Sequence, residues 1–235
     1  MPQEHTYRQF DTDLENMRAR VLQMGGLVEQ QISQAIEALM NADFVLADEV
    51  VDKDHLVNAL EVGIDEDCAQ IIARRQPTAS DLRMVITAVK TITDLERIGD
   101  EAAKVARMVR EIHETGRIIQ AKFNQINFMT EIVLDMLHRA LDGFARLDVS
   151  NATHIARQDI EVDEEYHLVL RNLITYMMED PRTISTFIDI MFVAKAIERM
   201  GDHTKNMSEY VVYMVKGKDV RHTTLEEIER HVGPD

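Results

Sequence analysis

Two acidic residues recur at the same spacing in two parts of the chain, each time within the sequence Glu-Arg-x-Gly-Asp. Glu96 and Asp100 belong to the first copy, and Glu198 and Asp202 belong to the second. Residues four apart on an α-helix project from one face, about one turn from each other. Each copy therefore predicts two neighbouring carboxylates on one helical face.

Each acidic pair continues a stripe of apolar residues, at positions where a packed helix normally carries another apolar side chain. An earlier helix in each half carries a second polar pair with the same four-residue spacing. These earlier pairs are Asp54 with Asn58 and Asp159 with Asp163. We expect the two polar pairs of each half to face each other and to form one cluster per half.

Carboxylates crowded between two helices destabilise a bundle unless protonation, arginine or a bound cation neutralises them. Arg97 and Arg199 each follow their glutamate by one residue, about 100° round the helix, and are poorly placed to pair with it. Ligands that are all oxygen suit hard ions. The pattern predicts metal sites for Mg²⁺, Mn²⁺ or Fe³⁺, with Ca²⁺ and Zn²⁺ as further candidates and the identity of the ion open.

A glycine stands between the two acids in both halves, at Gly99 and Gly201. Glycine inside a helix costs about 1 kcal/mol relative to alanine. Its repetition predicts that another group approaches closely there, or that an ion and its waters need the space.

The apolar periodicity of the remaining chain predicts long helices in a duplicated order. The expected helices cover residues 14–39 and 45–72, then 123–147 and 153–178, and Pro77 and Pro181 each open a third helix. Asp100 and Asp202 are 102 residues apart, and Leu14 and Phe123 are 109 apart. The sequence therefore predicts an all-α fold, a tandem repeat of two antiparallel three-helix bundles with six long helices. The repeats would span residues 1–115 and 116–216, and a tail, loose or forming a short helix, would span 217–235.

The composition limits the classes of partner. The 235 residues include 42 acidic and 26 basic side chains, giving a formal charge of −16, which repels nucleic acid. No apolar run approaches the roughly 20 residues of a bilayer span, and the N-terminus lacks the apolar region of a signal peptide. The single cysteine, Cys68, allows no internal disulfide, and we expect it to be buried. These features predict a cytoplasmic protein that neither binds nucleic acid nor inserts into a membrane.

Four segments carry a family resemblance, at residues 75–83 (RQPTASDLR), 94–100 (DLERIGD), 196–202 (AIERMGD) and 217–222 (GKDVRH). With these segments in order, the chain resembles the PhoU family of phosphate-signalling regulators along nearly its whole length. The resemblance implies six helices in two bundles and one set of metal ligands per bundle. The first set is Asp54, Asn58, Glu96 and Asp100, and the second is Asp159, Asp163, Glu198 and Asp202. Asn58 departs from an all-carboxylate set and is expected to weaken or alter the first site.

The resemblance also implies a role without catalysis. Such a protein is a negative regulator that helps to switch off the phosphate-starvation response and modulates phosphate uptake. It would couple the ATPase subunit of the phosphate ABC transporter to a sensor histidine kinase. It would reach the membrane only through these partners, and we expect it to be a homodimer.

Three alternatives stay open at this point. One is a carboxylate-bridged metal enzyme, although no Glu-x-x-His motif, the ligand pattern of ferritin-like di-metal sites, lies on a stripe at either cluster. Another is a structural helical adaptor whose acids are merely solvated. The third is direct phosphate sensing by Arg74, Arg75 and Arg83.

Overall fold

The computed structural model describes residues 3–113, 123–221 and 223–232, and within these ranges the chain forms helices and no strands. Six helices are long and two are short. They are α1 (Gln3–Asn41), α2 (Phe44–Arg75), α3 (Ala79–His113), α4 (Asn124–Arg146), α5 (Ala152–Glu179), the 3₁₀ helix η2 (Pro181–Thr183), α6 (Ile184–Lys216) and α7 (Leu225–Val232). The predicted all-α fold is confirmed.

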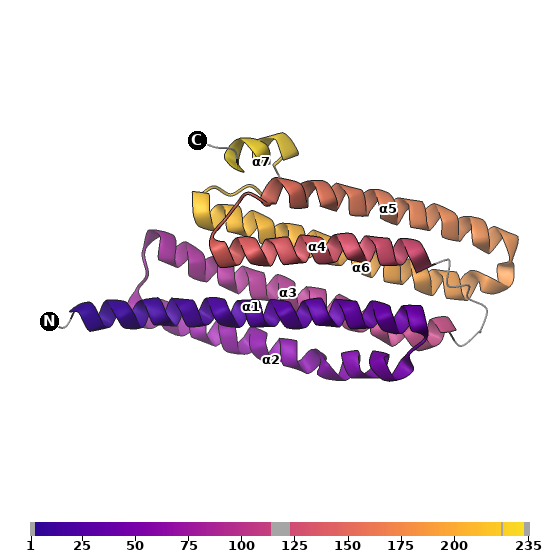
Figure 1. Ribbon diagram of the computed structural model, residues 1–235, viewed down its shortest axis with the longest axis horizontal. Coiled ribbons are helices and arrows are strands. Elements are labelled where there is room, and N and C mark those ends of the chain that lie inside the picture. The colour runs from indigo at the N-terminus through magenta and orange to yellow at the C-terminus, as the bar shows by residue number, and fades with distance from the viewer. Residues whose placement is uncertain (1–2, 114–122, 222, 233–235) are drawn as a thin grey trace.

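The six long helices form two three-helix bundles that lie side by side (Figure 1). Helices α1, α2 and α3 pack on one another, as do α4, α5 and α6, and α3 packs along α6 where the bundles meet. Near one end of this contact the Thr87 hydroxyl donates to the carbonyl of Tyr210, and farther along Glu101 pairs with Arg199. Residue numbers therefore rise along α3 while they fall along α6, so the two equivalent helices are antiparallel.

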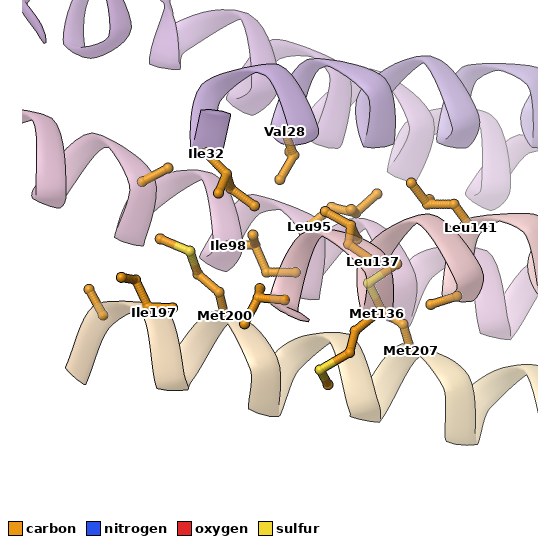
Figure 2. Packing of buried hydrophobic residues seen from close by; sticks show 14 of the residues in the cluster. Val28, Ile32, Leu95, Ile98, Met136, Leu137, Leu141, Ile197, Met200 and Met207 are labelled. Atoms are coloured by element: carbon orange, nitrogen blue, oxygen red, sulfur yellow. The ribbon is translucent and has the colours of Figure 1, made fainter. Parts of the chain in front are cut away.

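The two bundles share one hydrophobic core. Figure 2 shows Val28 of α1, Leu95 of α3, Leu137 of α4 and Met200 of α6 within a single layer of packed side chains. All four are fully or almost fully buried. Burial of apolar surface thus holds the repeats to each other as well as holding each bundle together. The repeat boundary that we expected at residue 115 lies outside the described residues.

The pair of glycines in α1 allows a close contact with the second bundle. A β-carbon added at Gly25 would lie 2.5 Å from the side chain of Leu141 in α4. At Gly26 a β-carbon would meet nothing within 4 Å. The absence of a side chain at Gly25 is therefore what lets α1 and α4 approach each other.

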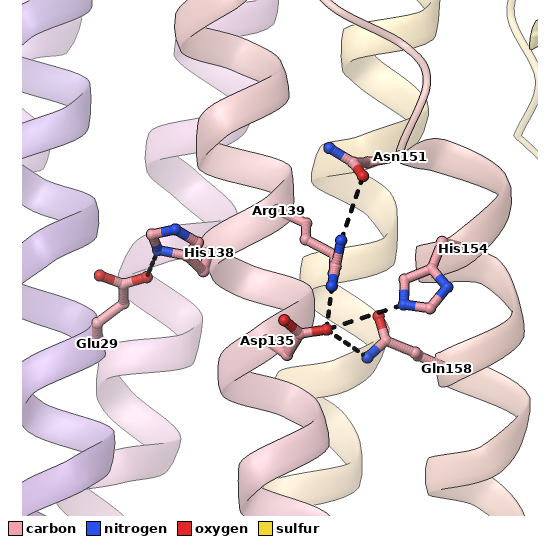
Figure 3. A network of polar contacts seen from close by, with 7 residues as sticks. All are labelled: Glu29, Asp135, His138, Arg139, Asn151, His154 and Gln158. Carbon is pink, nitrogen blue, oxygen red and sulfur yellow. Dashed lines mark hydrogen bonds and ion pairs between the residues drawn. The ribbon is translucent and has the colours of Figure 1, made fainter.

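A polar network on the outside of the second bundle also positions α4 (Figure 3). Asp135 of α4 accepts hydrogen bonds from Arg139 on its own helix and from Gln158 on α5, at 2.7 and 2.8 Å. On the other side, His138 Nδ1 lies 3.4 Å from Glu29 Oε1 of α1. These contacts link α4 to α1 on one side and to α5 on the other.

The two prolines behave differently. Asp180 caps η2 by accepting a hydrogen bond from the backbone of Arg182, and Pro181 opens η2, which leads into α6 as predicted. The prediction that Pro77 opens a helix was wrong, because α3 begins at Ala79. Gln76 ends α2 in the left-handed conformation, with a φ of 49°, so the chain needs two further residues to turn before α3 can start.

The tail folds back onto the second bundle. Val220 and Ile228 are buried, and Arg157 of α5 pairs with Glu229 of α7 at 2.6 Å. The expected short helix is therefore α7. Within the described ranges, no helix is long and apolar enough to cross a membrane. Cys68 is buried as expected, and burial raises the pKa of its thiol to about 12.

Candidate metal centre

The first acidic cluster lies between α2 and α3, which pack against each other. Asp54 forms its base with only 8% of its surface exposed, because it occupies a core-facing position between Val50 and Val57. Glu96 is half-buried on the facing helix, and Asp100, one turn further on, is exposed at the rim. Burial raises the pKa values of Glu96 and Asp100, and Asp54 lies near enough to both for its charge to raise them further.

The carboxylates of this cluster act on one another electrostatically. Burial and then the charges of Asp100 and Glu61 raise the pKa of Glu96 above its usual value. Burial and then the charge of Asp54 raise the pKa of Asp100. Glu61 of α2 is half-buried and is the fourth carboxylate of the cluster. Within the described residues, no lysine or arginine forms an ion pair with Asp54, Glu61, Glu96 or Asp100. A bound cation would relieve this repulsion.

Gln31 of α1 brings an unpaired oxygen to the base of the first cluster. Its Nε2 donates to Asp54 Oδ1 at 3.1 Å, so its side chain is directed at this carboxylate. Gln31 is 94% buried, with 6% exposed, and its Oε1 has no hydrogen-bond partner. Buried polar atoms are normally paired, so an orphan amide oxygen beside a carboxylate is a donor still available to a cation.

Gly99 and Gly201 differ in what surrounds them. A β-carbon at Gly99 would lie 2.9 Å from Gln31 Oε1, closer than real contacts allow. A β-carbon at Gly201 would make ordinary contacts of 3.6 Å with Val133 and Val162. The predicted close approach is therefore present at Gly99, where the glutamine reaches the cluster, and no such need exists at Gly201.

The second cluster occupies the equivalent place between α5 and α6. Asp159 and Glu198 are buried, while Asp163 and Asp202 are exposed at the rim. Burial and then the charges of Glu198 and Asp163 raise the pKa of Asp202. The four predicted residues of the second half thus lie near one another.

Lysines pair with the buried acids of the second cluster. Lys205 Nζ lies 2.6 Å from Asp159 Oδ2, and Lys195 forms an ion pair with Glu198. Burial lowers the pKa of Lys205, but its hydrogen bond to Asp159 and the charge of that carboxylate outweigh burial, so the net pKa is raised. The second cluster therefore contains its own cations.

Sequence reasoning placed most of the clustered residues and missed several. Asn58 is exposed on α2, and Glu61, one turn further on, supplies the fourth carboxylate of the first cluster. Glu61 could have been found because it lies on the same stripe as Asp54, and Lys195 because it stands three residues before Glu198. Nothing in the sequence pointed to Gln31 or Lys205, which reach their partners from other helices.

The arginines of the motifs lie where the spacing predicted. Arg97 Nη1 is 4.0 Å from Asp94, and Arg199 pairs with Glu101 across the two bundles. Neither arginine forms an ion pair with the glutamate that precedes it.

The fit to a metal ion rests on the chemistry of the donors. Within the described ranges, no three acidic, histidine or cysteine side chains converge closely enough to form a ready coordination sphere. At the first cluster, four carboxylates without a lysine or arginine ion pair among the described residues, and an orphan amide oxygen, match the all-oxygen preference of a hard cation. At the second cluster, lysine ammonium groups already hold the buried carboxylates, so that cluster fits a metal ion poorly.

The three arginines considered for phosphate sensing do not form one site. Arg74 and Arg75 line a cavity of about 170 Å³ that Asp13 and Asp67 also line, and Arg75 pairs with Asp13 at 3.0 Å. Arg83 instead directs its guanidinium to the carbonyl of Met214 in α6. The cavity shares no lining residue with either acidic cluster, and its mixed charge gives no preference for an anion.

Comparison with known proteins agrees with the duplication. The model of the PhoU domain matches the chain twice, over residues 21–109 and 126–211. The chain belongs to the PhoU family. The two matched PhoU domains correspond to the two bundles, and each includes one acidic cluster.

Individual PhoU proteins resemble the chain over most of their length. The phosphate-specific transport system accessory protein PhoU of Escherichia coli is 46% identical over 227 residues, which cover 97% of this chain and 93% of that protein. The crystal structure of PhoU from Pseudomonas aeruginosa aligns with a TM-score of 0.84 at 45% identity, covering 89% of this chain and 100% of that one. The crystal structure of the phosphate transport system regulatory protein PhoU from Streptococcus pneumoniae aligns with a TM-score of 0.82 at 31% identity, covering 90% of this chain and 99% of that one.

Proposed function

We propose that this chain is a non-catalytic, metal-binding adaptor of phosphate-specific transport, and that it acts in the cytoplasm as a negative regulator of the phosphate-starvation response. The observation that carries the proposal is the presence of two PhoU domains in a chain that matches nearly the whole length of a protein named as a phosphate-specific transport accessory protein. The regulatory part of the proposal is supported by the name of the Streptococcus pneumoniae protein.

In this proposal the chain couples the ATPase subunit of the phosphate ABC transporter to a sensor histidine kinase and acts as a homodimer. It reaches the membrane through these two partners. Long helices suit such a role, since they present extended surfaces to partners.

A deletion strain tests the regulatory role. Loss of the gene should leave a phosphate-starvation reporter switched on in phosphate-rich medium, and the wild-type chain supplied in trans should switch it off. Pull-down of the ATPase subunit and of the sensor kinase by the purified chain tests the coupling. Normal repression in the deletion strain would contradict the proposed regulation.

The proposed metal centre is the first cluster, with Asp54, Glu61, Glu96, Asp100 and the Gln31 amide oxygen as donors. A bound hard cation such as Mg²⁺, Mn²⁺, Fe³⁺ or Ca²⁺, or the softer Zn²⁺, would neutralise carboxylates on α2 and α3 and so stabilise the packing of these helices. Support comes from the mutual repulsion of these carboxylates, which have no lysine or arginine ion pair among the described residues, and from the orphan oxygen of Gln31.

Metal analysis of protein purified without chelator tests this centre. The wild-type chain should retain a cation that Glu96→Gln and Asp100→Asn lose. Affinity should rise as the pH rises through the pKa values of Glu96 and Asp100, which burial and then neighbouring negative charges hold above the ordinary carboxyl values, because protons compete with the cation. A chain that binds no cation at neutral pH would instead be a metal-free adaptor. This second candidate is favoured by the lack of a ready coordination sphere among the residues that the structure describes.

A further inference from the structure

The two acidic clusters differ in the residues that stand beside them on the third helix of each repeat. Lys195 and Lys205 of α6 pair with Glu198 and Asp159. The positions 102 residues earlier are Thr93 and Ala103 in α3. Thr93 donates its hydroxyl to the carbonyl of Val89 on its own helix, and Ala103 has no polar group. The first repeat therefore has no cation at the places where the second has two.

The lysines are placed to neutralise the acids that solvent reaches least. The side chains of Asp159 and Glu198 are 7% and 11% exposed, whereas those of Lys205 and Lys195 are 34% and 44% exposed. Lysine can keep its apolar stem against the protein while its ammonium group pairs with a buried acid. Lys195 precedes Glu198 by three residues and Lys205 follows Asp202 by three, so the two ammonium groups bracket the acidic pair of α6.

The remaining charges around each cluster do not remove this contrast. Burial and neighbouring acids raise the pKa values of Glu96 and Asp100; the charges of Arg97 on Glu96 and of Arg107 on Asp100 offset only part of this rise, and neither arginine forms an ion pair with these acids. In the second repeat, the position of Arg107 is taken by Glu209, whose charge also acts on Lys205.

We propose that Lys195 and Lys205 are built-in cations that take the place of a metal ion in the second repeat, so that the chain holds its hard cation in the first repeat alone. The second half of this statement rests on the proposed metal-binding function. Removal of a carboxylate from the first repeat should therefore weaken cation binding. Removal of the equivalent carboxylate from the second repeat should leave cation binding unchanged.

Titration of the full-length chain with Mn²⁺, followed by the electron paramagnetic resonance signal of free Mn²⁺, tests the asymmetry. Asp100→Asn should weaken Mn²⁺ binding about tenfold or more, a loss typical of metal-site substitutions. The matched variant Asp202→Asn should leave both the affinity and the number of bound ions unchanged. A loss of bound Mn²⁺ in Asp202→Asn would overturn the proposal.

The lysines themselves are tested by their removal. The double variant Lys195→Met/Lys205→Met should bind additional Mn²⁺, and adding Asp202→Asn to it should abolish the gain. A folded double variant that binds no more Mn²⁺ than the wild type would also overturn the proposal. If the wild-type chain binds no Mn²⁺ but the double variant does, the metal centre of the first repeat fails while the role of the lysines stands.

Thermal unfolding without metal separates this role from simple misfolding. Lys205→Met should lower the melting temperature because Asp159 is then buried without a partner, and Asp159→Asn should restore much of the loss. Excess Mn²⁺ should raise the melting temperature of the double lysine variant more than that of Lys205→Met/Asp159→Asn, because a ligand that binds only the folded state stabilises it.

Discussion

His203 Nδ1 of α6 lies 2.8 Å from Asp94 Oδ1 of α3, and this pair joins the third helices of the two repeats inside the protein. The side chains are 11% and 4% exposed, so neither is well solvated. Replacing His203 with leucine should destabilise the fold by about 2 kcal/mol, because the buried Asp94 carboxylate loses the imidazole and keeps only Tyr210 and the more distant Arg97 as partners. Chemical denaturation measures the loss.

A double-mutant cycle is the control for this pair. Asp94→Leu/His203→Leu should be less destabilised than the sum of the two single variants, because no orphan charge remains. If the loss of unfolding free energy in the double variant equals the sum of the losses in the two single variants, Asp94 and His203 do not interact energetically across the repeats.

The neighbouring glycines of α1 should respond to alanine in opposite directions. Gly25→Ala should lower the free energy of unfolding by about 1–3 kcal/mol, because the new methyl group overlaps Leu141. Gly26→Ala, which meets open space, should raise it by about 0.5–1 kcal/mol through higher helix propensity. Leu141→Ala should offset part of the Gly25→Ala loss. Equal effects at Gly25 and Gly26 would contradict the close contact of α1 with α4.

The motif glycines offer a second matched comparison. Gly201→Ala should stabilise the fold by about 0.5–1 kcal/mol, because its β-carbon makes ordinary contacts and the helix gains propensity. Gly99→Ala should gain little or lose stability, since the Gln31 amide must move and its hydrogen bond to Asp54 is lost. Denaturation of both variants, with Mn²⁺ affinity as a second measurement, distinguishes them. A weakened affinity in Gly201→Ala rather than in Gly99→Ala would show that Gln31 has no part in the site.

Glu209 predicts a particular pH dependence of stability. Burial raises the pKa of its carboxyl from 4.5 to about 7, in surroundings that include Lys205, Asp159, Asp219 and Arg221. Between these two values the folded chain binds more protons than the unfolded chain, so the contribution of Glu209 to stability falls as the pH rises towards about 7. Glu209→Gln should therefore be more stable relative to the wild type at pH 8 than at pH 5. Parallel stability curves for the two proteins across this range would rule out the titration of Glu209.

Periodicity and repetition along the chain were enough to predict the secondary structure. Apolar residues at helical spacing set the six long helices, and the repeated Glu-Arg-x-Gly-Asp sequence revealed the duplication. The acid pairs at Glu96 and Glu198 were also visible, because residues four apart share a helical face whatever surrounds the helix. Helix ends were less certain: Pro77 lies two residues before α3, since Gln76 turns the chain first.

Contacts between helices were decided by the tertiary structure. The four-residue spacing of the acids is the same in both clusters. In the structure, however, Gln31 donates a hydrogen bond to Asp54 of the first cluster, whereas Lys205 forms an ion pair with Asp159 of the second. The antiparallel packing of α3 on α6, which brings Asp94 to His203, was equally absent from any local pattern. The physical reason is that a helix fixes the relative positions of its own side chains through backbone hydrogen bonds, whereas the partners across a bundle depend on how whole apolar faces fit together.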